Sequence, residues 1–71
     1  LLAPSTNDAL GAAAKNIGML LNQKNVYFVP FFQDNCQSKP RSMVASMPHI
    51  LPAALAALEG VQLEPIILPP T

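Results

Sequence analysis

The stretch Pro4-Ser5-Thr6-Asn7-Asp8 decides how the first half of this chain is expected to fold. It follows the apolar residues Leu1 to Ala3 and precedes a run of helical periodicity from about Leu10 to Leu21. An apolar strand, a short polar turn and an amphipathic helix are the order in which an open α/β sheet presents a ligand-binding loop. The same polar side chains are also good helix caps, because their oxygens accept hydrogen bonds from backbone N–H groups. Capping and ligand binding are therefore both compatible with this stretch.

The periodicity after this turn predicts a helix and then a second strand. Apolar residues recur at the spacing of one helix face, at Leu10, Ala13, Ala14, Ile17, Leu20 and Leu21. Gly18 lies within that helix, where it costs about 1 kcal/mol relative to alanine, so we expect a closely packed neighbour there. The apolar run from Val26 to Val29, closed by Pro30, is typical of a buried parallel strand. Together these elements predict a right-handed βαβ unit with both strands in one parallel sheet.

Residues Phe31 to Arg41 are expected to form a loop on the same side of the sheet as Ser5 to Asp8. Two loops on the ligand side of one sheet indicate a small-molecule site more strongly than either loop alone. Lys39 and Arg41 flank Pro40 in this loop, and such a pair can hold a phosphate or a carboxylate. The alternative is an ordinary solvated connection with solvated charges.

The residues from Ser42 to Leu58 have a helical pattern that two prolines interrupt. Because proline is tolerated only in the first turn of a helix, we expect a turn or short helix at Ser42 to Met47 and the main helix from about Pro48 or Leu51. Gly60 is expected to end this helix. The apolar segment that follows, from Val61 to Leu68, should run extended as an edge strand or a packed arm.

The composition of the chain bounds what it can be. Its 71 residues allow one small domain, yet 51% are hydrophobic and only 11% are charged, which is too apolar for a solitary domain of this size. The chain also begins without a methionine, inside an expected strand, so we expect a fragment or a piece that packs on other protein. The net charge is zero and there is no basic patch, which argues against nucleic acid. No segment reaches the roughly 18 apolar residues of a membrane span.

The reactive side chains are few. Cys36 is the single cysteine, so it makes no internal disulfide, and no Cys/His spacing predicts a metal site. A catalytic role for Cys36 would need a neighbouring base, and the one histidine, His49, has no fixed relation to it in the sequence. A bystander or a lid residue is the competing interpretation of Cys36, and the catalytic residues stay unassigned.

Two segments of the chain resemble the family of bacterial dipicolinate synthase B subunits. They are Ser5-Thr6-Asn7-Asp8-Ala9-Leu10-Gly11 and Lys24-Asn25-Val26-Tyr27-Phe28-Val29-Pro30-Phe31, the second followed by Gln33-Asp34. The likeness continues in the same order through Lys39-Pro40, Ser42-Met43-Val44-Ala45, Met47 and Leu63-Glu64-Pro65-Ile66. The resemblance implies that residues 1–71 are the C-terminal part of such a subunit and a fragment of a single flavoprotein-like domain.

That family is similar to the flavin-dependent cysteine decarboxylases and flavin prenyltransferases, which bind FMN between the subunits of trimers or dodecamers. The implied fold is α/β, the C-terminal βαβ-α portion of a Rossmann-like three-layer flavoprotein fold with a parallel sheet. The Pro-Ala-Met-Asn motif of the decarboxylases matches this chain at Pro4 and Asn7, so the resemblance gives Asn7 a substrate-side role. The glycine-rich surroundings of the decarboxylase cysteine are missing here, so its role does not pass to Cys36.

The resemblance also implies a set of site residues. Substrate contacts fall on Asn7, Gln33, Asp34 and Arg41, and cofactor contacts fall on Ser5, Thr6, Lys39 and Ser42. The implied cofactors are FMN in this subunit and NADP on a partner A subunit.

The implied function is that of an oxidoreductase subunit that helps to oxidise dihydrodipicolinate to dipicolinate during sporulation. The implied location is the cytoplasm of the mother cell, and the implied assembly is a homo-oligomer with the A subunit as partner. An FMN-dependent decarboxylase or prenyltransferase-like flavoprotein is one alternative. An inactive fragment that binds no ligand is another, and the 71-residue chain by itself is expected to be inactive.

Overall fold

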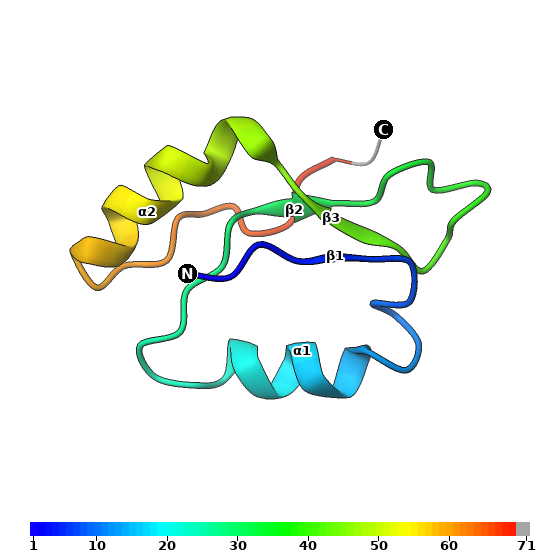
Figure 1. Ribbon diagram of the computed structural model, residues 1–71, viewed down its shortest axis with the longest axis horizontal. Helices are drawn as coiled ribbons and strands as arrows, with labels where there is room; N and C mark the ends of the chain where they lie inside the picture. Colours follow the sequence, from blue (N-terminus) through cyan, green and yellow to red (C-terminus); the bar gives the residue numbers. More distant parts are fainter. Residues whose placement is uncertain (70–71) are drawn as a thin grey trace.

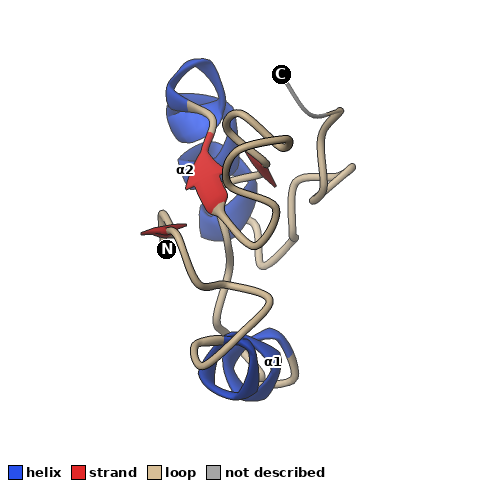
Figure 2. Ribbon diagram, turned by 90° about the vertical axis from the view of Figure 1, so that its right-hand side faces the viewer, coloured by secondary structure: helices blue, strands red, loops and turns tan. Residues whose placement is uncertain are grey.

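The computed structural model describes residues 1–69, in which short strands lie between two helices (Figure 1). In chain order the elements are β1 (Ser5–Thr6), α1 (Ala14–Leu21), β2 (Phe31–Phe32), β3 (Met43–Ala45), the 3-10 helix η1 (Met47–His49) and α2 (Ile50–Leu58). A view turned by 90° shows α1 at the lower end of the molecule, apart from α2 and the strands, which overlap in this view (Figure 2).

The three strands form an antiparallel sheet in the order β1-β3-β2, so the prediction of a parallel sheet is wrong. Val44 of β3 pairs with Ser5 on one side and with Phe32 on the other. The segments expected to be parallel strands meet only in an isolated parallel bridge between Leu2 and Phe28. The sequence predicts a turn or a short helix for the residues of β3, and instead they insert between the two segments.

Two prolines give a physical reason for this change of topology. In a parallel ladder every second residue of a strand uses its N–H and its C=O toward the same neighbour, and proline has no N–H to donate. Beyond the Leu2–Phe28 bridge, Pro4 and Pro30 therefore offer only carbonyls. The Ala45 N–H donates to the Pro4 carbonyl (2.7 Å) and the Ser46 N–H donates to the Pro30 carbonyl (2.9 Å). The N–H groups of Ala45, in β3, and of Ser46, just after it, thus pair with the two proline carbonyls.

Helix α1 begins at Ala14, later than the start near Leu10 that the periodicity predicts. Asp8 is the reason, because it accepts the backbone N–H groups that would otherwise begin the helix. Its carbonyl accepts from Gly11 (2.9 Å) and Ala13 (3.2 Å), and its carboxylate Oδ2 accepts from Ala12 (2.9 Å). The chain therefore makes turns from residue 7 to residue 13 before the helix starts.

The core is small and lies between α2 and the strands. Val29, Ala45 and Ala53 are each at most 2% exposed and form one cluster, against which Leu63 packs. The rings of Phe28 and Phe31 meet edge to face with their centroids 6.1 Å apart. A domain with so few buried side chains gains little stability from its core, and specific hydrogen bonds gain importance in consequence.

One of these hydrogen-bonding groups is a side chain that substitutes for a strand. The Gln62 Nε2 donates to the Phe28 carbonyl (2.7 Å), and its Oε1 accepts from the Phe28 N–H (2.8 Å). On the other side of this segment, Leu2 exchanges backbone hydrogen bonds with Tyr27 and Val29. The primary amide of Gln62 therefore satisfies the backbone groups of Phe28 that a neighbouring strand would otherwise satisfy.

Helix α2 and the segment after it follow the predictions more closely. The helix begins at Ile50, after the turn that contains Pro48, and ends before Gly60, which has φ of +73°. The N–H groups of Gly60 and Val61 donate to the carbonyls of Ala57 and Ala56, the paired bonds of a Schellman motif. Both the delayed start and the stop at Gly60 are confirmed.

The last extended segment packs beside β2. Ile67 forms a parallel bridge with Phe31, whose N–H donates to the Ile66 carbonyl (2.9 Å) and whose carbonyl accepts from Leu68 (2.8 Å). The prediction of a packed arm is confirmed for the described part of this segment. In residues 1–69 neither helix has the length and apolar character needed to cross a membrane.

Candidate functional site

The two segments predicted to face a ligand come together at one end of the sheet. Both β1 and β2 run antiparallel to β3, so they point in the same direction and their carboxyl ends meet at the amino end of β3. Thr6 pairs with Met43, and Phe32 pairs with Val44, which places Asn7 and Gln33 where the two outer strands leave the sheet. A hydrogen bond from the Leu10 N–H to the Arg41 carbonyl (3.1 Å) ties the two loops together.

Some polar side chains in and beside the turn after β1 are engaged in hydrogen bonds, and others are exposed to solvent. The Thr6 hydroxyl accepts from the Asp8 N–H (3.1 Å), and the Asp8 carboxylate is held by the Ala12 N–H. Asp8 therefore holds the turn before α1 and does not cap the helix, whose N-cap is Ala13 without a side-chain cap. Ser5 and Asn7 are exposed at this end of the sheet.

The loop between β2 and β3 is closed by its own hydrogen bonds. The buried Ser42 hydroxyl lies 3.1 Å from the Asp34 carbonyl and 3.0 Å from the Lys39 carbonyl. The Gln33 Nε2 donates to the Pro40 carbonyl (2.6 Å), which fixes the orientation of that amide. The structure therefore places Ser42 inside the loop and Gln33 at its base.

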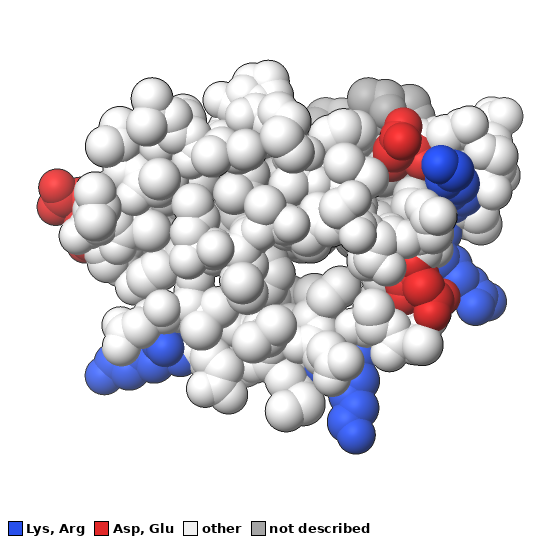
Figure 3. Space-filling model, in the orientation of Figure 1, with Lys and Arg blue, Asp and Glu red and all other residues white. Residues whose placement is uncertain are grey.

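The charged side chains of this loop point to solvent. Asp34, Lys39 and Arg41 are all exposed. Acidic and basic side chains gather at the end of the molecule that carries this loop, while the broad face between the two ends is uncharged (Figure 3). A cationic pair on an exposed loop attracts anions, and its effect is weakened by salt.

Two adjoining apolar hollows lie beside this end of the sheet. The first, here named the α1 groove, has a volume of about 190 Å³ and lies between α1 and the strands. The second, here named the β3 hollow, has a volume of about 210 Å³ and is lined by Leu10, Gln33, Met43, Ile67 and Leu68. Leu10, Met43 and Ile67 line both, so the two hollows are neighbours. Sequence reasoning missed both, because Ile67 and Leu68 reach them from the far end of the chain.

The remaining reactive side chains are Cys36, Ser46 and His49, and none of them makes a hydrogen bond to the polar residues at this end of the sheet. Cys36 is a half-buried free thiol within the loop between β2 and β3. The Ser46 Oγ and His49 Nδ1 share a hydrogen bond of 2.6 Å, but they follow β3 and so lie at the opposite end of that strand from the loops. Within residues 1–69, no three His, Cys, Asp or Glu side chains are grouped so that they could hold a metal ion.

Comparison with known proteins gives a consistent result. No protein-family model matches the chain. The chain is 46% identical over 69 residues to the dipicolinate synthase B subunit of Bacillus subtilis (strain 168), a match that covers 96% of this chain and 34% of that protein. The crystal structure of the dipicolinate synthase B subunit from Bacillus halodurans C is similar with a TM-score of 0.92 and 46% identity, over 97% of this chain and 35% of that one. The chain spans about a third of the length of these relatives.

Proposed function

Because the chain is homologous to the B subunit of dipicolinate synthase, we propose that it forms the dicarboxylate-binding part of such a subunit. The complete subunit would then take part in the oxidation of dihydrodipicolinate to dipicolinate. The observation that carries this proposal is that Asn7 and Gln33 follow the carboxyl ends of β1 and β2, that Gln33 lines the β3 hollow, and that the Arg41 carbonyl accepts from Leu10, which also lines it. Dipicolinate is a flat ring with two carboxylates, so its site needs an apolar slot flanked by donors and cations.

Different residues would contact the ring of the ligand and its two carboxylates. The ring would lie in the β3 hollow against Met43 and Leu10, and the volume of about 210 Å³ suits a small planar ligand. Arg41 would bind one carboxylate through its planar guanidinium, which matches two carboxylate oxygens, and Lys39 would add a second positive charge. The Asn7 amide would donate a further hydrogen bond. Binding would then orient the substrate.

Gln33 and Asp34 have distinct parts in this proposal. The hydrogen bond from Gln33 to the Pro40 carbonyl fixes its side-chain amide at the mouth of the β3 hollow, so it can position the ring. Asp34 has the same charge as the ligand and lies on the exposed rim. Its carboxylate would lower the affinity for a dianion, which limits retention of the product.

The contacts of this segment do not favour a flavin phosphate. In the turn before α1, Asp8 already accepts the N–H groups of Gly11, Ala12 and Ala13 and adds a negative charge, which disfavours a phosphate there. The Ser42 hydroxyl is fully buried in its own loop. Neither this turn nor Ser42 therefore offers a phosphate site, and no step of the proposed role runs through FMN.

The electrons removed from the dihydro ring would pass to a cofactor on a partner subunit. Oxidation of the dihydro ring removes a hydride and a proton, so an acceptor is required, and we propose NADP on an A subunit as the hydride acceptor, with the proton released to solvent. The residues of this chain would bind and orient the ring for that transfer.

A chimera tests this function. The matched third of the Bacillus subtilis protein is replaced by this chain, the chimera is combined with the A subunit, and formation of dipicolinate is followed by its ultraviolet absorbance. Arg41→Met and Asn7→Ala should each raise KM about tenfold, the effect of losing roughly 1.4 kcal/mol of binding, with an unchanged melting temperature. Lys15→Met on α1 is the control. An unchanged KM in both variants, or a chimera without activity, would contradict the proposal.

A further inference from the structure

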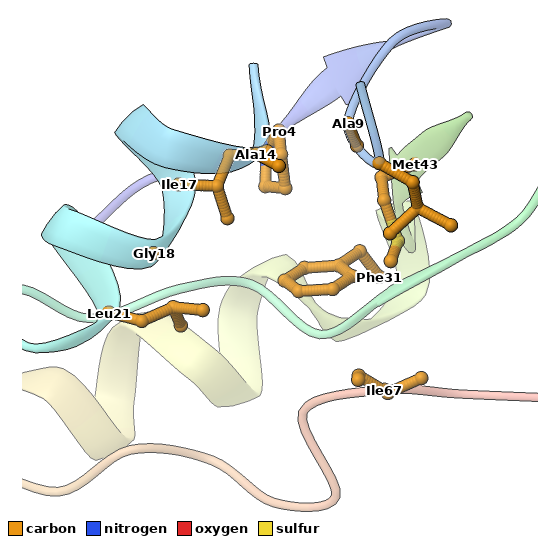
Figure 4. A pocket seen from close by; sticks show the side chains of 10 residues that line it. Pro4, Ala9, Ala14, Ile17, Gly18, Leu21, Phe31, Met43 and Ile67 are labelled. Carbon is orange, nitrogen blue, oxygen red and sulfur yellow. The ribbon is translucent and has the colours of Figure 1, made fainter. Parts of the chain in front are cut away.

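Gln33 is the one polar side chain among the described residues that line the β3 hollow. The others, which are Leu10, Met43, Ile67 and Leu68, are apolar. Met43 and Ile67 also line the neighbouring α1 groove, whose lining has no polar side chain (Figure 4). A polar ring atom of a ligand in the β3 hollow loses its hydrogen bonds to water. Of the described side chains that line the hollow, only Gln33 can replace such a bond.

The hydrogen bond to Pro40 decides which end of the Gln33 amide remains for a ligand. The Pro40 carbonyl can only accept, so the amide nitrogen Nε2 must face it, at 2.6 Å. In the described part of the chain the amide oxygen Oε1 accepts no hydrogen bond, and no side-chain polar atom there is both buried and unpaired. This oxygen is therefore accessible, and the free end of the amide is an acceptor.

The substrate and the product of the proposed reaction differ at the ring nitrogen. In its enamine form the dihydro ring carries an N–H, and a C–H bond of the adjacent ring carbon breaks as its hydride passes to the oxidised nicotinamide of the proposed NADP. The ring is then a pyridinium, with a positive charge shared by its N–H. Loss of that proton to solvent leaves the pyridine of dipicolinate, whose nitrogen has a lone pair and no hydrogen. An acceptor beside the nitrogen attracts the N–H forms and repels the pyridine.

We infer that the Gln33 Oε1 accepts a hydrogen bond from the ring N–H and thereby determines which ring the β3 hollow prefers. This inference rests on the proposed dicarboxylate site, whose cations bind the carboxylates that substrate and product share. The hydrogen bond strengthens as positive charge develops on the nitrogen, because a charged donor binds more strongly than a neutral one. Gln33 therefore stabilises the transition state more than the bound substrate, and it weakens binding of the product.

A pair of ligands that differ at the ring nitrogen alone tests the inference. Chelidamate has a ring N–H in its pyridone form, chelidonate has a ring oxygen at that position, and both have a carboxylate on either side of it. In calorimetry with the chimera described above, chelidamate should bind about tenfold more tightly than chelidonate. Gln33→Met keeps the length of the side chain without its amide and should bring the two affinities within about twofold of each other. Gln37→Met, in an exposed turn of the same loop, is the matched control and should keep the original ratio.

Turnover gives a second readout. In the chimera combined with the A subunit, Gln33→Met should lower kcat about tenfold and change KM by less than about threefold, because the hydrogen bond is strongest in the transition state. A Gln33 that only held the loop through Pro40 would behave differently. Its loss would weaken chelidamate and chelidonate equally and leave the ratio of their affinities unchanged.

The possible failures are distinguishable. Equal affinities of the unsubstituted chimera for the two ligands would overturn the inference and leave the dicarboxylate site standing. Tighter binding of chelidonate would also overturn it, because an N–H of Nε2 would then face the ring. A preference for chelidamate that persists in Gln33→Met would overturn it by assigning the ring nitrogen to another group. Binding of neither ligand at millimolar concentration would overturn the dicarboxylate site and this inference with it.

Discussion

Substitution of Gln62 is the sharpest test of how this small fold is held together. Its side-chain amide makes two hydrogen bonds with the backbone of Phe28, at 2.8 and 2.7 Å, and Phe28 is only 2% exposed. Gln62→Ala leaves both backbone groups without their partner. A buried unsatisfied group costs about 1–3 kcal/mol, so the loss of two should cost about 3 kcal/mol once some water reaches them.

That cost is large for this chain. Globular proteins have roughly 0.05–0.15 kcal/mol of stability per residue, which gives about 4–10 kcal/mol for a chain of this size. With an m-value of about 1 kcal/mol/M, the urea midpoint should fall by about 3 M. Circular dichroism in urea measures the shift. Gln37→Ala, in an exposed turn, is the control and should change stability by less than about 0.5 kcal/mol.

An isosteric change separates hydrogen bonding from packing. Gln62→Glu keeps the shape of the side chain but removes the donor that faces the Phe28 carbonyl. At pH 7 it should be nearly as destabilising as Gln62→Ala. Its stability should recover as the pH falls toward the usual glutamate pKa of about 4.3, because the protonated carboxyl can donate again. A pH-independent loss, or a loss below about 0.5 kcal/mol in Gln62→Ala, would refute the reasoning.

Four further substitutions probe the turn, the loop, the helix and the rim. Asp8→Ala should cost about 1 kcal/mol in urea unfolding, because the Ala12 N–H loses its acceptor. Ser42→Ala should cost roughly 1–2 kcal/mol, since its buried hydroxyl ties the loop together; unchanged stability would make Ser42 a candidate ligand contact again. Gly18→Ala should raise the stability of the isolated chain by about 0.5–1 kcal/mol in thermal unfolding, and a fall would reveal an unseen close contact. Asp34→Asn in the chimera should tighten dipicolinate binding severalfold by calorimetry, and weaker binding would assign Asp34 a direct contact.

Local signals in the sequence predicted some elements and misled on others. The start of α2, its stop at Gly60 and the packed arm follow from proline and glycine chemistry, which acts within a few residues. The strand β3 could not be predicted, because Met43–Ala45 has a pattern that suits a helix and its partners lie far away in the sequence. The late start of α1 could not be predicted, because the sequence marks Asp8 as a helix cap, whereas in the structure it holds the turn that precedes the helix.

The sequence predicted which segments meet at one end of the sheet, and whether their residues bind a ligand stays a prediction. The structure brings Asn7, Gln33 and Arg41 to one end of the sheet. We predicted this meeting from a parallel sheet, and that prediction of the sheet is wrong because the sheet is antiparallel. The strands β1 and β2 still point the same way because both pair with β3. The apolar hollows could not be predicted, since they depend on where residues 67 and 68 return to the sheet.

The most direct test of the dicarboxylate site is a chemical-shift map. The ¹⁵N-labelled chimera is titrated with dipicolinate, and the amide shifts of this chain's residues are followed. We expect saturable shifts centred on Asn7, Gln33 and Arg41, which are lost in Arg41→Met. Shifts centred elsewhere in the chain, or none at millimolar dipicolinate, would contradict this expectation.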